Sequence, residues 1–442
     1  MNRPIIDGKE SGNVCQRSRH DLLRRSQGHF DPHGWLGSKY RDMCCPAATP
    51  DYTFGTFILT PLTGVYEYRM KKIVINGLQY KKRSSGIGVM IRELFAPLTQ
   101  ITERTCQIIL PQDSPGFPVQ GTTELRIPFA HGENIRRICF QTFLMGRRYC
   151  EESVLLTTDS KTPFFLPRSC ILLPIITDLA VFRMPEVYQR SRVLWWRFQY
   201  RYLCRKAQYF VAISAFTKRE LVDVLGVDPK NIYVVPCAVP AHYDSQSKGT
   251  ARLMQLKQTC HLPEHYLLFV GNQNPRKNLQ RLLLAYDKAV GRENFPHHLV
   301  IAGEQGWKFN REACLAPIKN KDKVHFIGFV SDDDMPALYS GATMFLFPTL
   351  YEGFGIPVLE AQMCGTPVLT SNCTSLPEVG GDAAIYVDPY QVEDIALAIT
   401  QALQNPAALQ DLIQKGFENV KRYSWVQSAR LLNEIIEKVV SE

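Results

Sequence analysis

The sequence predicts an α/β protein in which two doubly wound domains face a central cleft. Runs rich in β-branched residues alternate with amphipathic helical patterns from Met70 onwards. A polar, turn-rich stretch at 240–250 divides this alternation into two parts. Each part begins with a strand, a loop and a helix, as doubly wound domains do, and such domains bind ligands at the carboxyl ends of their strands.

The composition is that of a folded globular chain. Of 442 residues, 45% are hydrophobic and 21% charged, which excludes a largely disordered or fibrous protein. No uncharged apolar run approaches the ~20 residues of a membrane helix, and the N-terminus lacks the apolar region of a secretory signal. The 13 cysteines include no CxxC pair, so we expect reduced thiols in the cytoplasm. The net charge of +9 is mild and does not by itself identify a partner.

We predict five segments along the chain. They are an N-terminal extension (1–69), a first domain (70–240), a linker (241–262), a second domain (263–422) and a C-terminal helix that returns to the first domain (423–442). The extension shows no sustained period. It is interpreted as poorly ordered or as upstream sequence from a wrong start codon, and a small accessory module stays open as the alternative.

Buried strands and helices are expected in order along both domains. The expected strands are 71–78, 169–179, 208–214, 231–239, 266–271, 298–303, 324–330, 343–349, 366–371 and 384–388. The expected helices of the first domain include 87–95, 190–208 and 218–225. Ser214 and Asn278 are candidate N-caps. The stretch 111–168 gives no readable pattern, and we expect it to shape the acceptor side.

The most informative segment runs from Pro348 to Val368. Gly353 and Gly355 let the backbone approach a ligand closely, and free N–H groups around Phe354–Ile356 would point out of a helix N-terminus. Pro357 suits the first turn of that helix, and Gly365 suits its end. The segment therefore predicts a phosphate seat.

Two carboxylates flank this seat, Glu352 in the loop and Glu360 in the helix. Carboxylates accept strong hydrogen bonds from sugar and ribose hydroxyls, so a sugar nucleotide is a suitable ligand. The alternative is an ordinary helix whose acidic first turn is favoured by the helix dipole.

The motif E-G-F-G-x-P-x-x-E-A-x-x-x-G-T-P-V resembles the E-x7-E motif of glycosyltransferase family 4. This family comprises retaining sugar transferases of the GT-B fold, with two Rossmann-like domains. Further similar segments follow in the family's order: Gly86–Gly88, Phe269–Leu279, His325–Ala342, Ser375–Ala384 and Tyr423–Trp425. The resemblance extends from Met70 nearly to the C-terminus.

The resemblance implies roles for individual residues. Glu352 would lie at the donor sugar beside the backbone of Gly353, Phe354 and Gly355, and Glu360 would bind the ribose. Arg276 and Lys277 would hold the donor diphosphate, whose developing charge cations stabilise. The alternative, solvated charges before a helix, is disfavoured because two positive charges oppose the helix dipole there. Gly86 and Gly88 would belong to a loop that closes on the diphosphate.

One position departs from the family pattern. Many relatives carry His-Asp after the central strand of the first domain, where this chain has Thr177 and Asp178. Threonine can donate one hydrogen bond but does not titrate near pH 7. On a front-face mechanism, in which the diphosphate takes the acceptor proton, the histidine is only a helper. The resemblance still implies a catalytic region formed by Glu352, Asp178 and Thr177.

No metal or other cofactor is expected. Asp332–Asp334 could be mistaken for a metal-binding D-x-D motif, but Ser331 followed by Asp334 is typical of a capping box. Family members use arginine and lysine in place of the metal. The expected donor is a GDP- or UDP-sugar.

The resemblance favours a mannose-type donor and a saccharide or lipid-linked acceptor in surface polysaccharide synthesis. The alternative is a catalytically silent sugar-nucleotide-binding protein, suggested by Thr177. A GT-B phosphorylase would need a pyridoxal phosphate lysine, for which no matching segment is seen here, and GT-B isomerases lack the P-R-K-N and E-x7-E pair that this chain has. A nucleic-acid partner is not expected because only one helix combines cations with aromatics.

That helix, 190–208, holds six cations and no acid. Arg197, Arg201 and Arg205 repeat along one face, and the opposite face is apolar: Val193, Trp196, Tyr200, Leu203 and Ala207. Such a helix could lie on an anionic membrane, which would make the protein peripheral on the inner face of the cytoplasmic membrane. An ordinary surface helix with solvated arginines is the alternative.

Overall fold

In the computed structural model, the described residues belong to one compact unit, 67–442. The structure describes residues 72–81, 86–158, 161–243, 251–293 and 295–442. The predicted N-terminal extension (1–69) therefore lies outside the described residues, as does most of the polar stretch at 240–250.

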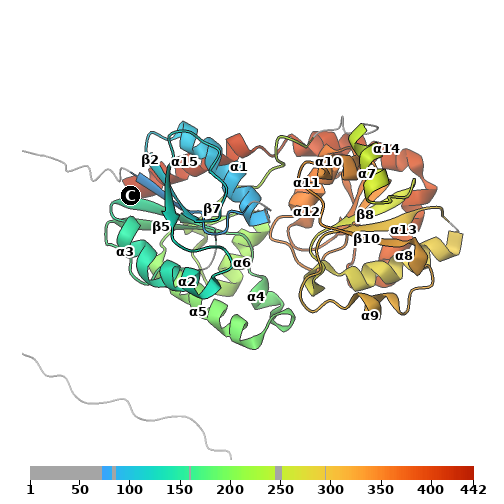
Figure 1. Cartoon of the computed structure of the whole chain (residues 1–442), viewed down its shortest axis with the longest axis horizontal. Coiled ribbons are helices and arrows are strands. Elements are labelled where there is room, and N and C mark those ends of the chain that lie inside the picture. The colour runs from blue at the N-terminus through green and yellow to red at the C-terminus, as the bar shows by residue number, and fades with distance from the viewer. Residues whose placement is uncertain (1–71, 82–85, 159–160, 244–250, 294) are drawn as a thin grey trace, which may run out of the picture. The chain divides into compact units, whose positions relative to one another are not determined.

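Seven parallel strands form the sheet of the first domain, in the order β3-β2-β1-β4-β5-β6-β7 (Figure 1). Their bounds are β1 Lys72–Asn76, β2 Thr105–Pro111, β3 Thr123–Ile127, β4 Ser153–Thr157, β5 Cys170–Ile176, β6 Phe210–Ala212 and β7 Ile232–Val234. The expected strands β1, β5, β6 and β7 are present. The sequence did not reveal β2, β3 and β4, although β4 lies in the middle of the sheet and is buried throughout.

Helices cover both faces of this sheet, which is the doubly wound arrangement. Ile73 and Ile75 pack in one apolar cluster with α1, whereas Val74 packs in another with residues of α5 and α6. The helices are α1 Gly86–Ile101, α2 Asn134–Cys139, α3 Met145–Tyr149, α4 Ala180–Arg183, α5 Arg190–Lys206 and α6 Ala215–Leu225. A π-helical turn, Phe140–Leu144, joins α2 to α3, and a 3-10 turn, Pro185–Val187, follows α4.

Six parallel strands form the second sheet, in the order β10-β9-β8-β11-β12-β13. They are β8 Tyr266–Val270, β9 His298–Ala302, β10 Val324–Gly328, β11 Met344–Phe347, β12 Val368–Ser371 and β13 Ala384–Val387. Every strand expected from the sequence of this domain is present. The strand order reverses between β8 and β11, and a crevice at the carboxyl ends of two such strands is where open α/β sheets bind ligands.

The second domain begins earlier in the chain than predicted, because one of its helices, α7, precedes residue 263. Its helices are α7 Ala251–Thr259, α8 Leu279–Glu293, α9 Arg311–Leu315, α10 Met335–Ser340, α11 Ile356–Met363, α12 Leu376–Gly380, α13 Val392–Gln404 and α14 Pro406–Val420. Helix α7 falls within the predicted linker (241–262). Leu253 and Leu256 form a buried stripe on α7, which packs against α10, so this part of the predicted linker belongs to the second domain.

The last helix, α15 (Trp425–Ser441), packs against α1 of the first domain. An ion pair of 2.6 Å joins Arg104 Nη2 to Glu437 Oε2, and Ser428 Oγ donates to the carbonyl of Pro236 over 2.7 Å. The C-terminal helix therefore leaves the second domain and covers the first.

Candidate functional site

Two loops that follow adjacent strands form the centre of the site. The loop after β8 carries Lys277, and the loop after β11 carries Glu352. Lys277 Nζ lies 2.9 Å from Glu352 Oε1, and both side chains are about one-tenth exposed, at 12% and 10%. Lys277 Nζ also lies 4.6 Å from the centroid of the Phe347 ring, at the end of β11. The strand reversal therefore brings together two residues that are 75 positions apart.

Asn278 fixes the relative position of these loops. Its backbone is left-handed, with φ 59°, and its side-chain amide donates to the carbonyls of Pro348 (2.9 Å) and Pro389 (2.7 Å). Asn278 also lies at the predicted N-cap position, directly before α8, where its backbone carbonyl accepts from Leu282 N over 3.1 Å and its side-chain oxygen accepts from Arg281 Nη1 over 3.0 Å. The carbonyl of Arg276 accepts from Leu350 N over 2.9 Å and adds a second link.

The first domain contributes a carboxylate to the same place. Asp178 follows β5, and its Oδ2 lies 3.2 Å from Arg276 Nη1. Its other oxygen accepts from Ala180 N over 3.0 Å, which orients the carboxylate at the start of α4. We call Asp178, Arg276, Lys277 and Glu352 the charge cluster. Its two cations and two carboxylates balance each other.

Mutual attraction keeps most of this cluster charged despite its burial. Burial opposes ionisation of Glu352, but Lys277 and Arg276 outweigh it and hold the pKa of Glu352 below its usual value. Burial also acts against the charged form of Arg276, yet Glu352 and Asp178 raise the pKa of Arg276. For Lys277 burial prevails, and its pKa is lowered although Glu352 offsets part of the effect. An added anion would stabilise both cations.

Gly353 lies against the first domain, where only glycine fits. A Cβ atom on Gly353 would lie 1.8 Å from the carbonyl oxygen of Thr177. The carbonyl of Gly353 accepts from Ser214 Oγ (2.6 Å) and Thr217 Oγ1 (3.1 Å), at the start of α6. Ser214 is also the predicted N-cap of α6, and its hydroxyl accepts from Thr217 N. The backbone of Thr177, at the departure from the family pattern, thus touches the motif loop directly.

Helix α11 begins where the motif predicts. Gly355 has φ 108° and precedes Ile356, and Pro357 lies in the first turn. In the described part of the chain, no protein acceptor pairs with the N–H groups of Gly355 and Ile356, so they are available to an anion. The side chain of Phe354 is buried and meets Tyr423 edge-on at 5.6 Å, which leaves its backbone for the site.

Glu360 lies on α11 beside two tyrosines that the sequence analysis missed. Tyr339 donates to Glu360 Oε2 over 2.9 Å, and Tyr243 also hydrogen-bonds to this carboxylate. Burial raises the pKa of Glu360 to about 7, against the opposing effect of both hydroxyls. Lys277 is close enough to act on the same pKa, which connects Glu360 to the charge cluster.

The two glycines predicted to close on the diphosphate begin a helix. Helix α1 starts at Gly86, so Gly86 and Gly88 lie in its first turn and not in a loop. The N–H groups of a first helical turn have no partner within the helix, and the role of these glycines at the diphosphate stays a prediction.

The acidic run before α10 makes one of the two contacts of the predicted capping box, because the Asp334 carboxylate bonds to the Ser331 hydroxyl and not to its backbone N–H, and Asp334 itself is the N-cap residue of α10. Ser331 Oγ bonds to Asp334 Oδ2 (2.6 Å) and accepts from Asp334 N (3.2 Å), and Arg252 Nε lies 2.6 Å from Asp334 Oδ1. Within the described ranges, no group of three or more His, Cys, Asp or Glu residues is placed to hold a metal ion.

Further residues that the sequence analysis missed join the two domains beside the site. Glu378 accepts from Ala215 N (2.7 Å) and Phe216 N (3.0 Å) at the N-terminus of α6. Tyr351 Oη bonds to Leu179 N (3.2 Å) and to Glu220 Oε2 (3.3 Å). All these pairs are distant in sequence, so no local pattern could have identified them.

Two parallel-sheet domains with a charge cluster at the switch point of the second sheet define a protein of the GT-B fold. Similar solved structures support this. Sucrose-phosphate synthase from Thermosynechococcus elongatus matches with a TM-score of 0.66 and 17% identity, over 84% of this chain and 99% of that one. WaaG, a glycosyltransferase involved in lipopolysaccharide biosynthesis, matches with a TM-score of 0.62 and 15% identity, over 82% of this chain and 99% of that one. At these identities the likeness shows the fold alone, and the predicted fold class is confirmed.

Two parts of the chain match family models of glycosyltransferases, which supports the predicted resemblance to glycosyltransferase family 4. Residues 257–419 match the family described as "Glycosyl transferases group 1", and residues 177–243 match "Glycosyltransferase Family 4". It is 32% identical over 250 residues to the O-antigen chain mannosyltransferase B of Escherichia coli, covering 56% of this chain and 65% of the relative. The serotype-specific mannosyltransferase WbdA of the same species is 31% identical over 229 residues, which cover 51% of this chain and 28% of the relative. The chain thus spans less than two-thirds of these curated relatives.

Proposed function

We propose that this protein is a retaining glycosyltransferase that moves a sugar from a nucleoside-diphosphate sugar to a saccharide or lipid-linked saccharide acceptor. One observation carries the proposal. The cations Arg276 and Lys277, the carboxylate of Glu352 and the free N–H groups of α11 converge at the switch point of the second sheet. A cation pair beside a helix N-terminus suits a diphosphate, and a buried carboxylate suits sugar hydroxyls.

The residues divide the donor among them. Arg276 and Lys277 hold the diphosphate, Glu352 binds the sugar, and Glu360 binds the ribose in its ionised form. In the transfer step the bond from the anomeric carbon to the diphosphate oxygen breaks, and the acceptor oxygen bonds to that carbon on the same face. The acceptor proton goes to the departing diphosphate. Both cations then stabilise the negative charge that develops on the leaving group.

The sugar and acceptor are inferred from the relatives. Mannose is favoured because the O-antigen chain mannosyltransferase B and WbdA are mannosyltransferases by name. UDP-sugars are included among the donors to be tested, because the Anabaena structure that matches with a TM-score of 0.60 and 13% identity is a complex with UDP and glucose. The O-antigen chain in the names of two relatives also supports a surface polysaccharide acceptor. None of the helices in the described ranges is long and apolar enough to cross a bilayer.

A second function, a catalytically silent sugar-nucleotide binder, is favoured by one observation. Thr177 stands where many family members carry histidine, and its backbone is packed on Gly353. If position 177 must supply an imidazole, the protein would bind the donor without transfer.

A panel of GDP-, UDP- and ADP-sugars tests both functions. The donor should raise the melting temperature, because a ligand at 100 times its Kd adds about 2.7 kcal/mol of stability. Release of nucleoside diphosphate from the same donor without acceptor then separates an enzyme from a silent binder. The isosteric Glu352→Gln variant is the matched control, since it should lose hydrolysis. Stabilisation with no hydrolysis by the wild type would support the silent binder, and no stabilisation by any donor would contradict both.

A further inference from the structure

Large apolar side chains are exposed side by side on the first domain. They lie on the π-helical turn, on the segment before β5 and on α5. Their exposed fractions are 46% for Phe143, 56% for Leu144, 55% for Phe165, 69% for Leu194, 36% for Trp195 and 50% for Phe198. We call these six residues the apolar patch.

Ring contacts join the three segments into one surface. The half-buried ring of Phe164 lies 5.4 Å from Phe143 and 6.2 Å from Phe198, and Phe198 lies 5.9 Å from Trp195. Tyr202 holds Phe164 in place, because its hydroxyl donates to the carbonyl of Phe164 over 3.0 Å. The exposed rings are therefore fixed on ordered backbone.

The apolar patch is not needed for the core of the domain. Helix α5 already buries Val193, Tyr200 and Leu203, as predicted for its apolar face. Leu194, Trp195 and Phe198 lie outside that buried stripe. Contiguous apolar surface of this kind on a folded domain marks a site of interaction with a protein or a membrane.

The charge around the apolar patch identifies the partner. The three segments that carry it, 134–150, 161–168 and 190–206, contain twelve lysines and arginines and no acid, whereas the whole chain has a net charge of only +9. The rest of the chain is therefore slightly acidic. Arg136 pairs with Glu133 just outside these segments, but the segments themselves keep an excess of cations. Apolar side chains on segments with such an excess match an anionic lipid surface, in which phosphates lie above an apolar layer.

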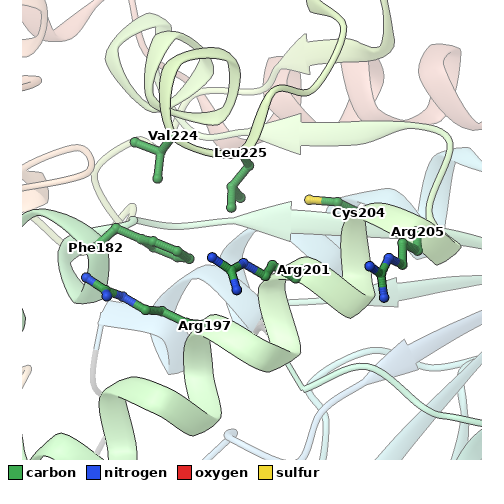
Figure 2. Close-up of a pocket in the computed structure, with 7 residues that line it drawn as sticks. All are labelled: Phe182, Arg197, Arg201, Cys204, Arg205, Val224 and Leu225. Carbon is green, nitrogen blue, oxygen red and sulfur yellow. The ribbon is translucent and has the colours of Figure 1, made fainter. Parts of the chain in front are cut away.

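Arginines of α5, the helix that also carries Leu194, Trp195 and Phe198 of the apolar patch, line a pocket of about 300 Å³ (Figure 2). Arg197, Arg201 and Arg205 line it from α5, together with Phe182 of α4 and two apolar residues of α6. Arg197 lies over the Phe182 ring at 5.7 Å, and its Nε is buried without a hydrogen-bond partner. None of the three has an acidic partner in the described part of the chain. Three neighbouring cations repel one another, and a bound phosphate group would relieve that repulsion.

We propose that the apolar patch inserts into the interface of an anionic bilayer while Arg197, Arg201 and Arg205 bind lipid phosphates. This inference rests on the proposed function in one respect, because a lipid-linked acceptor would be located at a membrane. Binding of vesicles requires neither donor nor catalysis, so the two proposals can fail independently.

Flotation of the full-length protein with lipid vesicles tests this surface. We expect strong binding to vesicles that contain about one-third phosphatidylglycerol, weak binding to pure phosphatidylcholine, and loss of binding at high salt. The variant Phe143→Ser, Phe165→Ser, Phe198→Ser should bind the anionic vesicles at least tenfold more weakly. Replacing Arg197, Arg201 and Arg205 by Gln should weaken binding similarly and reduce its salt dependence.

Exposed apolar residues on other helices provide a matched control. Met254, Leu397 and Val426 are exposed by 60%, 48% and 47%, and replacing all three by Ser should leave vesicle binding unchanged. Equal loss in this control, wild-type binding by the apolar-patch variant, or equal binding of neutral vesicles would overturn the proposal. Melting curves and donor hydrolysis in solution show whether each variant is folded.

Insertion itself can be detected at Trp195. Brominated acyl chains should quench its fluorescence in the bound protein, and Trp195→Phe should remove most of the quenching. Quenching that persists in this variant would place a different part of the protein in the bilayer.

Discussion

The ion pair between Lys277 and Glu352 is predicted to serve both stability and transfer, and a double-mutant cycle can separate the two. The single variants are Glu352→Gln and Lys277→Met, which keep the approximate shape of each side chain. Because both side chains are nearly buried, at 10% and 12% exposed, removing one partner leaves a poorly solvated charge. Such a loss typically costs about 3–5 kcal/mol.

The two single variants should not be equally unstable. Without Glu352, Lys277 keeps the repulsion of Arg276, which already lowers the pKa of Lys277. Without Lys277, Glu352 retains the attraction of Arg276, which lowers the pKa of Glu352. Glu352→Gln is therefore expected to lie at the upper end of the range and Lys277→Met at the lower end. The double variant should be more stable than the sum predicts, by about 1–3 kcal/mol of coupling.

Transfer should respond differently from stability. Each single variant is expected to lose about 10²–10³ in kcat/KM, because each removes a charged contact made to the transition state. The double variant should regain stability but no activity. The measurements are urea unfolding and donor hydrolysis on all four proteins. Recovery of hydrolysis together with stability in the double variant would refute the reasoning, because the pair would then be purely structural.

Further predictions concern the surroundings of the charge cluster. Gly353→Ala should lower the unfolding free energy by about 1–3 kcal/mol, because its Cβ would lie 1.8 Å from a carbonyl oxygen and overpack the contact. Its melting temperature and its transfer rate should both fall. Thr177→Val should lower kcat/KM roughly three- to thirty-fold in a transfer assay, if its hydroxyl donates one neutral bond worth about 0.5–1.5 kcal/mol; unchanged kinetics would remove the residue from the site. Donor affinity measured by calorimetry should rise between about pH 6 and 8, because Glu360 has a pKa of about 7 and binds ribose as the carboxylate. His298 and His325 share a hydrogen bond of 2.8 Å, and burial lowers the pKa of both. The unfolding free energy, measured in urea, should therefore be constant above about pH 6.5 and decrease as the pH falls below that value. In the His325→Gln variant this decrease should be smaller.

The second domain could be predicted from sequence because apolar runs such as those of β8, β9 and β11 stand out between helical patterns and are buried over most of their length. The first sheet was harder. Strand β3 lies at the edge and is mostly accessible, so its sequence TELRI shows no apolar run. Strand β4 is fully buried, but it lies within the stretch 111–168, whose sequence shows no readable pattern of strands and helices. Its position between β1 and β5 is set by strand pairing and not by any local signal.

The candidate site divides in the same way. Glu352, Lys277 and Arg276 stand in motifs whose local chemistry points to a diphosphate sugar. The contacts that position these residues could not be predicted, because Asn278, Tyr339 and Ser214 act on residues that are tens or hundreds of positions away in sequence. The apolar patch was missed for a related reason. Periodicity distinguishes one helical face from another, but it does not show which apolar residues the neighbouring segments leave uncovered.

The residues that would hold the donor also join the two domains, which has a consequence for how the donor enters. Arg276 pairs with Asp178 across the domains at 3.2 Å, whereas Lys277 pairs with Glu352 within one domain at 2.9 Å. Asp178 is the more accessible carboxylate, with a side chain 34% exposed. A longer and more solvated ion pair is weaker, so a diphosphate would take the place of Asp178 before it disturbed Glu352. Donor binding would then exchange an interdomain contact for a contact with substrate, while Glu352 stays in position for the sugar.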